Sequence, residues 1–457
     1  HELLLYKGEG ELIDDIPSNV TTTILTEKNR VRDAFETISK ADAIHLYTIN
    51  RASFFRDLAY LAGVPIIDNP RNMIDVQDPH RVEYIGCASW AIGQMQSVPS
   101  KIRIIPNGLS FDKQSSPDYQ KFSEDAPPNL IEIGRPDKER VIKAEDFMPR
   151  INQFHPDVTC HVVGRNGEDQ NGIVYHGEVE NPEPIYEHSH FLVHHPDLEP
   201  FGMTVLESYL HGVIPIVSGE GGIKQLVSNE ETGYYVEEVN ETSQVNQLNR
   251  VIQQYKSDPE FWIPMARNGF EYLKENYHID HFIERYEQLY KELPEPEIST
   301  PVQNWSNSFQ ALYENQTTEQ DHDTIHRKDP EEFPNVHERN WQRLNKAERL
   351  AETGPDTAEE FLDNLEDGGW NDPFKECYLR SEIHYHREEW PESIKWASKA
   401  IEKEPTVAEP YFTLTECQVK LNQYDKALES LESFEPYVKE EFDPTKELRN
   451  SIQELTD

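Results

Sequence analysis

The chain has few basic residues and no long apolar run, and each shortage excludes a class of protein. Among its 457 residues, 43 Lys and Arg stand against 85 Asp and Glu, which gives a formal net charge of −42. No basic stripe is visible, so direct binding of nucleic acid is disfavoured. No stretch approaches the ~20 consecutive apolar residues of a membrane span. We therefore expect a cytoplasmic protein, with peripheral contact at the cytosolic face of a membrane left open.

Cysteine is also scarce, and its spacing excludes the usual cysteine sites. The four cysteines, Cys87, Cys160, Cys377 and Cys417, are far apart in the sequence. They form none of the short spacings of zinc or dithiol sites, so buried thiols in a reducing cytosol are the preferred explanation.

Acidic residues, in contrast, occur along the whole chain. Because 36% of the residues are hydrophobic and several segments are periodic, disorder does not explain this composition. Dispersed acidity is typical of salt-adapted proteins, because at molar salt the screening length falls to about 3 Å and self-repulsion becomes tolerable. We therefore expect a halophilic source.

The most informative stretch is 191–217. A short apolar run ends in a polar loop, after which Met203, Leu206 and Leu210 recur at helical spacing. Gly212 stands where a glycine ends a helix, and 213–217 has the pattern of a buried strand. The stretch predicts a strand–loop–helix–strand unit of a parallel α/β sheet, in which ligands bind at the carboxyl ends of strands and at helix N-termini.

Glu199 in this loop and Glu207 in this helix are eight positions apart. Two such carboxylates suit the vicinal hydroxyls of sugars. The pattern resembles the E-x7-E signature of the retaining GT-B glycosyltransferases of glycosyltransferase family 4. The same resemblance extends to Pro200, Phe201, Gly202, Gly212, Pro215, Gly221, Gly222, Thr232 and Gly233.

The resemblance implies an α/β fold of the GT-B type, with two Rossmann-like domains facing a cleft. It also implies roles: Glu207 accepts hydrogen bonds from the nucleotide ribose, and Glu199 stands near the donor sugar. The N–H groups of residues 201–203 meet the sugar hydroxyls, and the glycine-rich loop near the β-phosphate forms an anion nest. The further donor-binding residues expected are Phe201, Gly202, Met203, Thr204, Gly221 and Gly222.

Two cations are expected to face the nucleotide diphosphate. The family has an arginine directly after the glycine that ends a strand, and Arg135 follows Gly134 in this way. It also has a lysine several residues later, for which we prefer Lys143 to Lys138 or Arg140. A leaving diphosphate develops charge that fixed cations must meet. A solvated basic group at a helix start is the alternative.

The first hundred and twenty residues alternate strands with helices, which predicts a shortened Rossmann-like domain. The segment 105–108, Ile-Pro-Asn-Gly, resembles the family's sequence before the interdomain hinge. The family's glycine-rich loop has only Gly8 and Gly10 as counterparts, and its histidine after the strand 64–68 is missing. His45 is the nearest substitute as a catalytic residue, and a purely structural histidine is the alternative.

Metal and cofactor are not expected. His188, His190, His194 and His195 are close in sequence but lack a recognisable ligand spacing. The family generally needs no metal at the donor site.

The tail repeats with a period of 34 residues. Trp390 and Tyr424, and Ala397 and Leu431, are each 34 apart. This spacing resembles tetratricopeptide hairpins, which bind partner peptides or proteins; an unrelated amphipathic helical bundle is the alternative. The predicted domains are 1–117, 118–292 for the donor, a linker at 293–340, and a helical domain at 341–457.

The leading hypothesis is a retaining glycosyltransferase that moves a sugar from a UDP- or GDP-sugar to a glycan, lipid-linked or protein acceptor. The competing hypothesis is a non-catalytic GT-B-like protein that binds sugar nucleotides and carries a partner-binding helical tail. The short N-terminal domain and the missing histidine favour the second.

Overall fold

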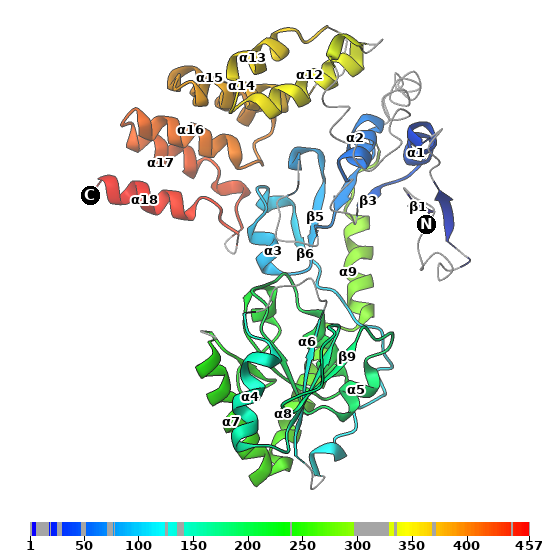
Figure 1. The fold of residues 1–457 in the computed structure, drawn as a ribbon. Coiled ribbons are helices and arrows are strands. Elements are labelled where there is room, and N and C mark those ends of the chain that lie inside the picture. Colours follow the sequence, from blue (N-terminus) through cyan, green and yellow to red (C-terminus); the bar gives the residue numbers. More distant parts are fainter. Residues whose placement is uncertain are drawn as a thin grey trace.

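The computed structural model describes residues 2–5, 18, 20–24, 30–46, 52–70, 76, 78–123, 127–134, 141–237, 240–296, 329–332, 336–367, 372–439 and 442–456. The chain forms two α/β domains and a helical region. In space the N-terminal domain lies between the second α/β domain and the helical region (Figure 1). The predicted fold class, two parallel sheets of the GT-B type plus an all-helical region, is confirmed.

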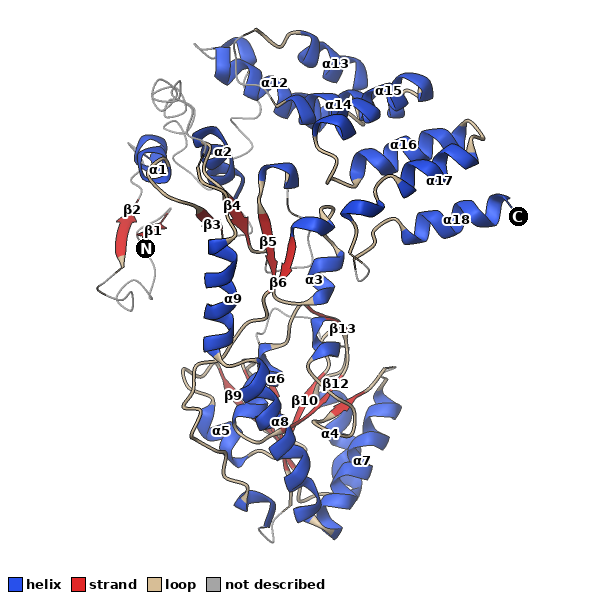
Figure 2. Cartoon of the chain, turned by 180° about the vertical axis from the view of Figure 1, so that it is seen from behind, coloured by secondary structure: helices blue, strands red, loops and turns tan. Residues whose placement is uncertain are grey.

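The N-terminal domain is built on a four-stranded parallel sheet of order β3-β4-β5-β6. All three residues of β4 are buried, as expected for a strand covered on both faces. A separate parallel pair, β1 and β2, lies beside this sheet (Figure 2). The elements are β1 (Glu2–Leu5), β2 (Thr21–Ile24), α1 (Arg30–Ile38), β3 (Ile44–Leu46), α2 (Ala52–Ala62), β4 (Ile66–Asp68), η2 (Pro79–Arg81), β5 (Tyr84–Cys87), α3 (Trp90–Gln94), η3 (Pro99–Lys101) and β6 (Ile102–Ile104).

The second domain has a six-stranded parallel sheet of order β14-β12-β10-β7-β8-β9. Its strand order reverses between β7 and β10, and such a switch point is where open α/β sheets bind ligands. The elements are η4 (Gln120–Ser123), β7 (Asn129–Ile133), α4 (Ala144–Phe154), β8 (Thr159–Val163), β9 (Ile173–Gly177), α5 (Glu183–His188), β10 (Phe191–His194), β11 (Leu198–Glu199), α6 (Met203–Leu210), β12 (Ile214–Val217), β13 (Glu220–Gly221), η5 (Gly222–Gln225), β14 (Tyr234–Tyr235), α7 (Glu241–Ser257), η6 (Pro259–Trp262) and α8 (Ile263–Asn276).

The helix α9 (Ile279–Lys291) crosses back onto the N-terminal domain (Figure 1). The amide of Asn69 donates to the hydroxyl of Tyr286 at 2.5 Å. At the crossing point the N–H of Leu109 donates to the carbonyl of Tyr277, and the N–H of Ile279 donates to the carbonyl of Leu109, both at 2.8 Å.

The helical region consists of antiparallel hairpins. The 34-residue repeat falls on α15 and α17, each the second helix of its hairpin, and α13 is the second helix of an earlier pair. A hairpin array is therefore present, while its tetratricopeptide identity stays a prediction. The elements are η8 (Pro330–Glu332), α12 (Val336–Leu350), α13 (Pro355–Asp363), α14 (Pro373–His386), α15 (Trp390–Lys403), α16 (Glu409–Lys420), α17 (Tyr424–Glu432), η9 (Glu435–Tyr437) and α18 (Lys446–Thr456).

Candidate functional site

The carboxyl ends of β7 and β10 meet the start of α4. The N–H of Val141 donates to the carbonyl of His195 at 2.9 Å. The segment that leads into α4 therefore lies against the loop after β10. Both belong to the switch point of the sheet, where we expected the donor.

The loop that carries Glu199 is held against the glycine-rich loop. Strands β11 and β13 pair in parallel, which places Glu199 opposite Gly221. A Cβ on Gly222 would lie 2.1 Å from the carbonyl oxygen of Pro200 and 2.7 Å from the Cβ of Ser89. Only glycine fits here, because two loops of this domain and a loop of the N-terminal domain meet at one point.

The N-terminus of α6 opens directly after these loops. Gly202 is its N-cap, with a left-handed φ of 106°, and Phe201 before it is buried. The N–H groups of Met203 and Thr204 belong to the first turn, where no carbonyl of the same helix accepts them. The hydroxyl of Thr204 is buried without a hydrogen-bond partner among the described residues. The turn thus presents donors that a ligand can accept.

Glu207 lies one turn further along α6. Its carboxylate accepts a hydrogen bond from the hydroxyl of Tyr186 on α5 at 3.1 Å. Burial raises the pKa of Glu207, and the Tyr186 hydrogen bond opposes that rise. The ring of His211 stacks on Tyr186 at 5.2 Å. Tyr186 therefore orients the carboxylate that we expect to meet the ribose.

Of the two cations expected to face the diphosphate, the structure describes only Lys143. Arg135 lies outside the described residues, as do Lys138 and Arg140. Lys143 is the N-cap of α4; its N–H donates to the carboxylate of Asp146 at 2.8 Å, and its side chain is exposed. Lys143 thus stands at a helix start beside the switch point. Its diphosphate role stays a prediction.

An ion-pair network at the start of α4 was missed from the sequence. Glu132 is 2% exposed; it accepts the N–H of Ala144 and a hydrogen bond from Arg165, both at 2.6 Å. Arg165 also reaches Glu145 at 2.7 Å. Burial raises the pKa of Glu145, but the hydrogen bond from Arg165 outweighs burial, and the pKa falls to about 2. The signal that could have found the network is a glutamate within the otherwise apolar end of β7.

His45 is the middle residue of β3, and its side chain faces the crossover helix α9. Its Nδ1 is 2.7 Å from the hydroxyl of Tyr290, and its ring packs on Tyr286 at 4.7 Å. These contacts give it a structural setting, and its catalytic role stays a prediction.

Two of the histidines near β10 form hydrogen bonds within the protein. His190 accepts the N–H of Asn129 through Nδ1 at 3.0 Å, and His195 is 2.8 Å from the hydroxyl of Ser218. Within the described ranges, no three His, Cys, Asp or Glu residues form a group that could hold a metal ion. In the same part of the chain, no helix has the length and apolar character that crossing a bilayer requires.

Comparison with known proteins agrees with this geometry. Residues 137–268 match the family model of "Glycosyl transferases group 1". An uncharacterised 41.2 kDa protein of the cps region of Klebsiella pneumoniae is 26% identical over 207 residues, which cover 42% of this chain and 55% of that protein. The chain therefore spans about half the length of this curated relative.

Two solved structures show the same fold. HepE of Anabaena in complex with UDP has a TM-score of 0.53 at 13% identity, over 64% of this chain and 99% of that one. A glycosyltransferase of Rickettsia africae has a TM-score of 0.53 at 14% identity, over 64% of this chain and 90% of that one. Residues 137–268 are thus similar to group 1 glycosyl transferases, and the chain shares the fold of these two solved structures.

Proposed function

We propose that the protein is a retaining glycosyltransferase that moves a sugar from a nucleotide-sugar to a glycan, lipid-linked or protein acceptor. The observation that carries the proposal is the setting of Glu199 and Glu207 around the N-terminus of α6, at the switch point of the sheet. Both lie within the residues that match the family model. HepE was solved with UDP, so UDP-sugars are the first donors to test, with GDP-sugars second.

Each side chain has a distinct task in this proposal. The Glu207 carboxylate accepts hydrogen bonds from ribose hydroxyls, and Tyr186 keeps it in position. Glu199 and the first N–H groups of α6 contact the donor sugar. Lys143 and Arg135 stabilise the departing diphosphate, whose charge develops in the transition state. The acceptor attacks the same face that the diphosphate leaves, and the leaving phosphate takes the acceptor proton, so no protein nucleophile is needed.

The test is release of isotope from labelled UDP-sugars, with Glu207→Gln and Lys143→Met compared with wild type. Loss of one hydrogen bond to a charged group costs about 1.5–3 kcal/mol, so we expect Glu207→Gln to lower kcat/KM by roughly 10- to 100-fold. Glu275→Gln and Lys291→Met, both exposed and on α8 and α9, are the matched controls and should stay near wild type.

The pH dependence of UDP binding gives a second test of the role of Glu207. Burial raises its pKa, and the ionised form is the better acceptor for ribose hydroxyls. Binding of UDP should therefore weaken as the pH falls through this raised pKa, and Glu207→Gln should lose that step. Tight UDP-sugar binding without turnover, across a panel of acceptors, would contradict the enzyme proposal and favour the non-catalytic binding protein.

A further inference from the structure

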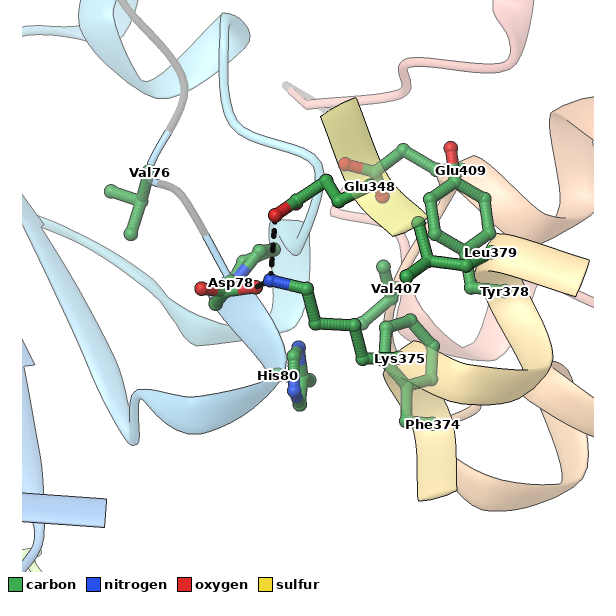
Figure 3. Close-up of a pocket in the computed structure, with 11 residues that line it drawn as sticks. Val76, Asp78, His80, Glu348, Phe374, Lys375, Tyr378, Leu379, Val407 and Glu409 are labelled. Carbon is green, nitrogen blue, oxygen red and sulfur yellow. Dashed lines mark hydrogen bonds and ion pairs between the residues drawn. The ribbon is translucent and has the colours of Figure 1, made fainter. Parts of the chain in front are cut away.

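A cavity of about 260 Å³ lies between the N-terminal domain and the helical region (Figure 3). One wall is the segment that includes Asp78 and His80, and the opposite wall comes from α12, α14 and α16. Nothing in the proposed transfer reaction uses it, because its walls come from the N-terminal domain and the helical region. Figure 1 shows the helices α12 and α14 on the side of the N-terminal domain that faces away from the donor domain.

Its floor is fixed by buried charges. Asp372, 1% exposed, accepts from His80 Nε2 at 2.8 Å and from Arg81 at 2.9 Å. The ammonium of Lys375 is 3.0 Å from both Asp78 and Glu348. These partners hold the walls together and preform the cavity.

One polar atom in the floor of the cavity is available to a ligand. The His80 side chain lines the cavity and is 6% exposed, and its Nδ1 has no hydrogen-bond partner in the part of the chain that the structure describes. In the tautomer whose Nε2 donates to Asp372, Nδ1 of His80 carries a lone pair and is an acceptor. A buried acceptor without a partner is costly, so the site favours a ligand that brings an N–H donor.

The walls favour a donor that is also a cation. Glu409 lines the cavity beside the ring of Tyr378, and Phe374 stacks on that ring at 6.1 Å. Burial and then the charges of Glu382 and Glu409 raise the pKa of the Tyr378 hydroxyl. A carboxylate beside aromatic faces is the usual environment of an ammonium or guanidinium group.

The negative charge continues beyond the cavity along α14 and α16. Glu382 and Tyr385 follow Tyr378 at helical spacing, and Tyr385 donates to Glu416 on α16 at 2.7 Å. Burial and the charge of Glu416 together raise the pKa of Glu382. A ligand that covers this surface needs several positive charges along an extended backbone.

We propose that the cavity binds a lysine or arginine side chain of a basic polypeptide that lies along α14 and α16. Its volume is below the ~300–1,000 Å³ of pockets for drug-sized ligands and suits one long side chain. The aliphatic stem contacts Phe374 and Tyr378, while the charged head meets Glu409 and donates to His80 Nδ1.

The test measures fluorescence anisotropy of a labelled peptide of alternating Arg and Leu with the full chain, at about 0.15 M salt. A peptide with citrulline in place of Arg keeps the shape and removes the charge. Glu409→Gln should weaken binding of the Arg peptide about tenfold, as expected for a charged contact that is lost. Glu402→Gln, an exposed position on α15 outside the cavity, makes the same change in net charge and should have little effect.

Tyr378→Leu is a second variant, which removes the ring and should also weaken binding; thermal unfolding shows that each variant is folded. Equal effects of Glu409→Gln and Glu402→Gln, or equal binding of the citrulline peptide, would overturn the proposal. If spermidine binds as tightly as the peptide and also loses affinity in Glu409→Gln, the ligand is a free polyamine and the polypeptide assignment is wrong. Isotope release from UDP-sugars should not change in these variants, so this inference stands or fails apart from the proposed transfer.

Discussion

The N-terminal domain makes different kinds of contact with the helical region and with the donor domain. Towards the helical region, Arg81 and Asp372 form a pair at 2.9 Å in which each side chain is at most 2% exposed. Phe442 also stacks on Trp90 at 4.6 Å. Towards the donor domain, the contacts include the crossover helix α9, a hydrogen bond from the hydroxyl of Ser89 to the carbonyl of Pro200 at 2.6 Å, and one from the N–H of Trp90 to the side-chain oxygen of Gln225 at 3.3 Å.

The difference concerns which parts can move. Buried pairs of opposite charge tolerate little displacement, because each charge left alone in the interior is costly. The hydrogen bonds of Ser89 and Trp90 towards the donor domain are half-buried or exposed and involve no buried charge, so they leave rotation about a hinge. The helical region therefore belongs mechanically to the N-terminal domain, and relative motion should occur at the donor side.

The largest effect should come from Asp372→Asn, which removes the nearer of the two carboxylates beside the buried Arg81 and leaves Asp78 at 3.6 Å. We expect a loss of roughly 3–5 kcal/mol in the free energy of unfolding, measured by urea denaturation. Asp425→Asn, exposed on α17, is the matched control. A loss no larger than that of the control would mean that the helical region is not fixed by this pair.

The same carboxylate predicts a pH dependence. Burial raises the pKa of Asp372, but the hydrogen bond from His80 and the charge of Arg81 outweigh burial and hold this pKa well below its usual 3.8. A depressed pKa stabilises the fold above the unfolded value, and this stability is lost as the pH falls below about 3.8. Asp372→Asn should remove this part of the acid sensitivity.

A smaller effect is expected on the donor side from Gly222→Ala. The added Cβ would lie 2.1 Å from the carbonyl oxygen of Pro200, so backbone must shift, at a cost of about 1–3 kcal/mol. Gly354→Ala, whose Cβ would meet its nearest atom at 3.7 Å, is the control. Differential scanning calorimetry and UDP binding should both respond to Gly222→Ala; an unchanged melting temperature would mean that the two loops of the donor domain are not in contact there.

The smallest effect should come from Tyr286→Phe, which removes the hydrogen bond from Asn69 and keeps the ring against His45. We expect about 1 kcal/mol. Tyr424→Phe, with an exposed hydroxyl contact to Asn422, is the control. If Tyr286→Phe is as costly as Asp372→Asn, the two sides of the domain are held equally firmly and the hinge argument fails.

Local sequence patterns predicted much of the fold. The unit predicted over 191–217 is confirmed, because strands β10 and β12 flank α6, where apolar residues recur at helical spacing. Glu207 lies in the predicted helix, whereas Glu199, predicted in the loop before it, lies in the short strand β11. The partner of β11 is β13, and local patterns in the sequence do not predict this pairing.

The sequence by itself determined the parallel strand–helix units, the donor-side motif and the period of the tail, since each depends on residues close together in the chain. Only the tertiary structure decided that Tyr186 positions Glu207, that Glu132 and Arg165 hold the start of α4, and that Arg81 meets Asp372, 291 positions away. Such pairs depend on which surfaces the packed domains bring together, and no periodicity in the sequence predicts these long-range contacts.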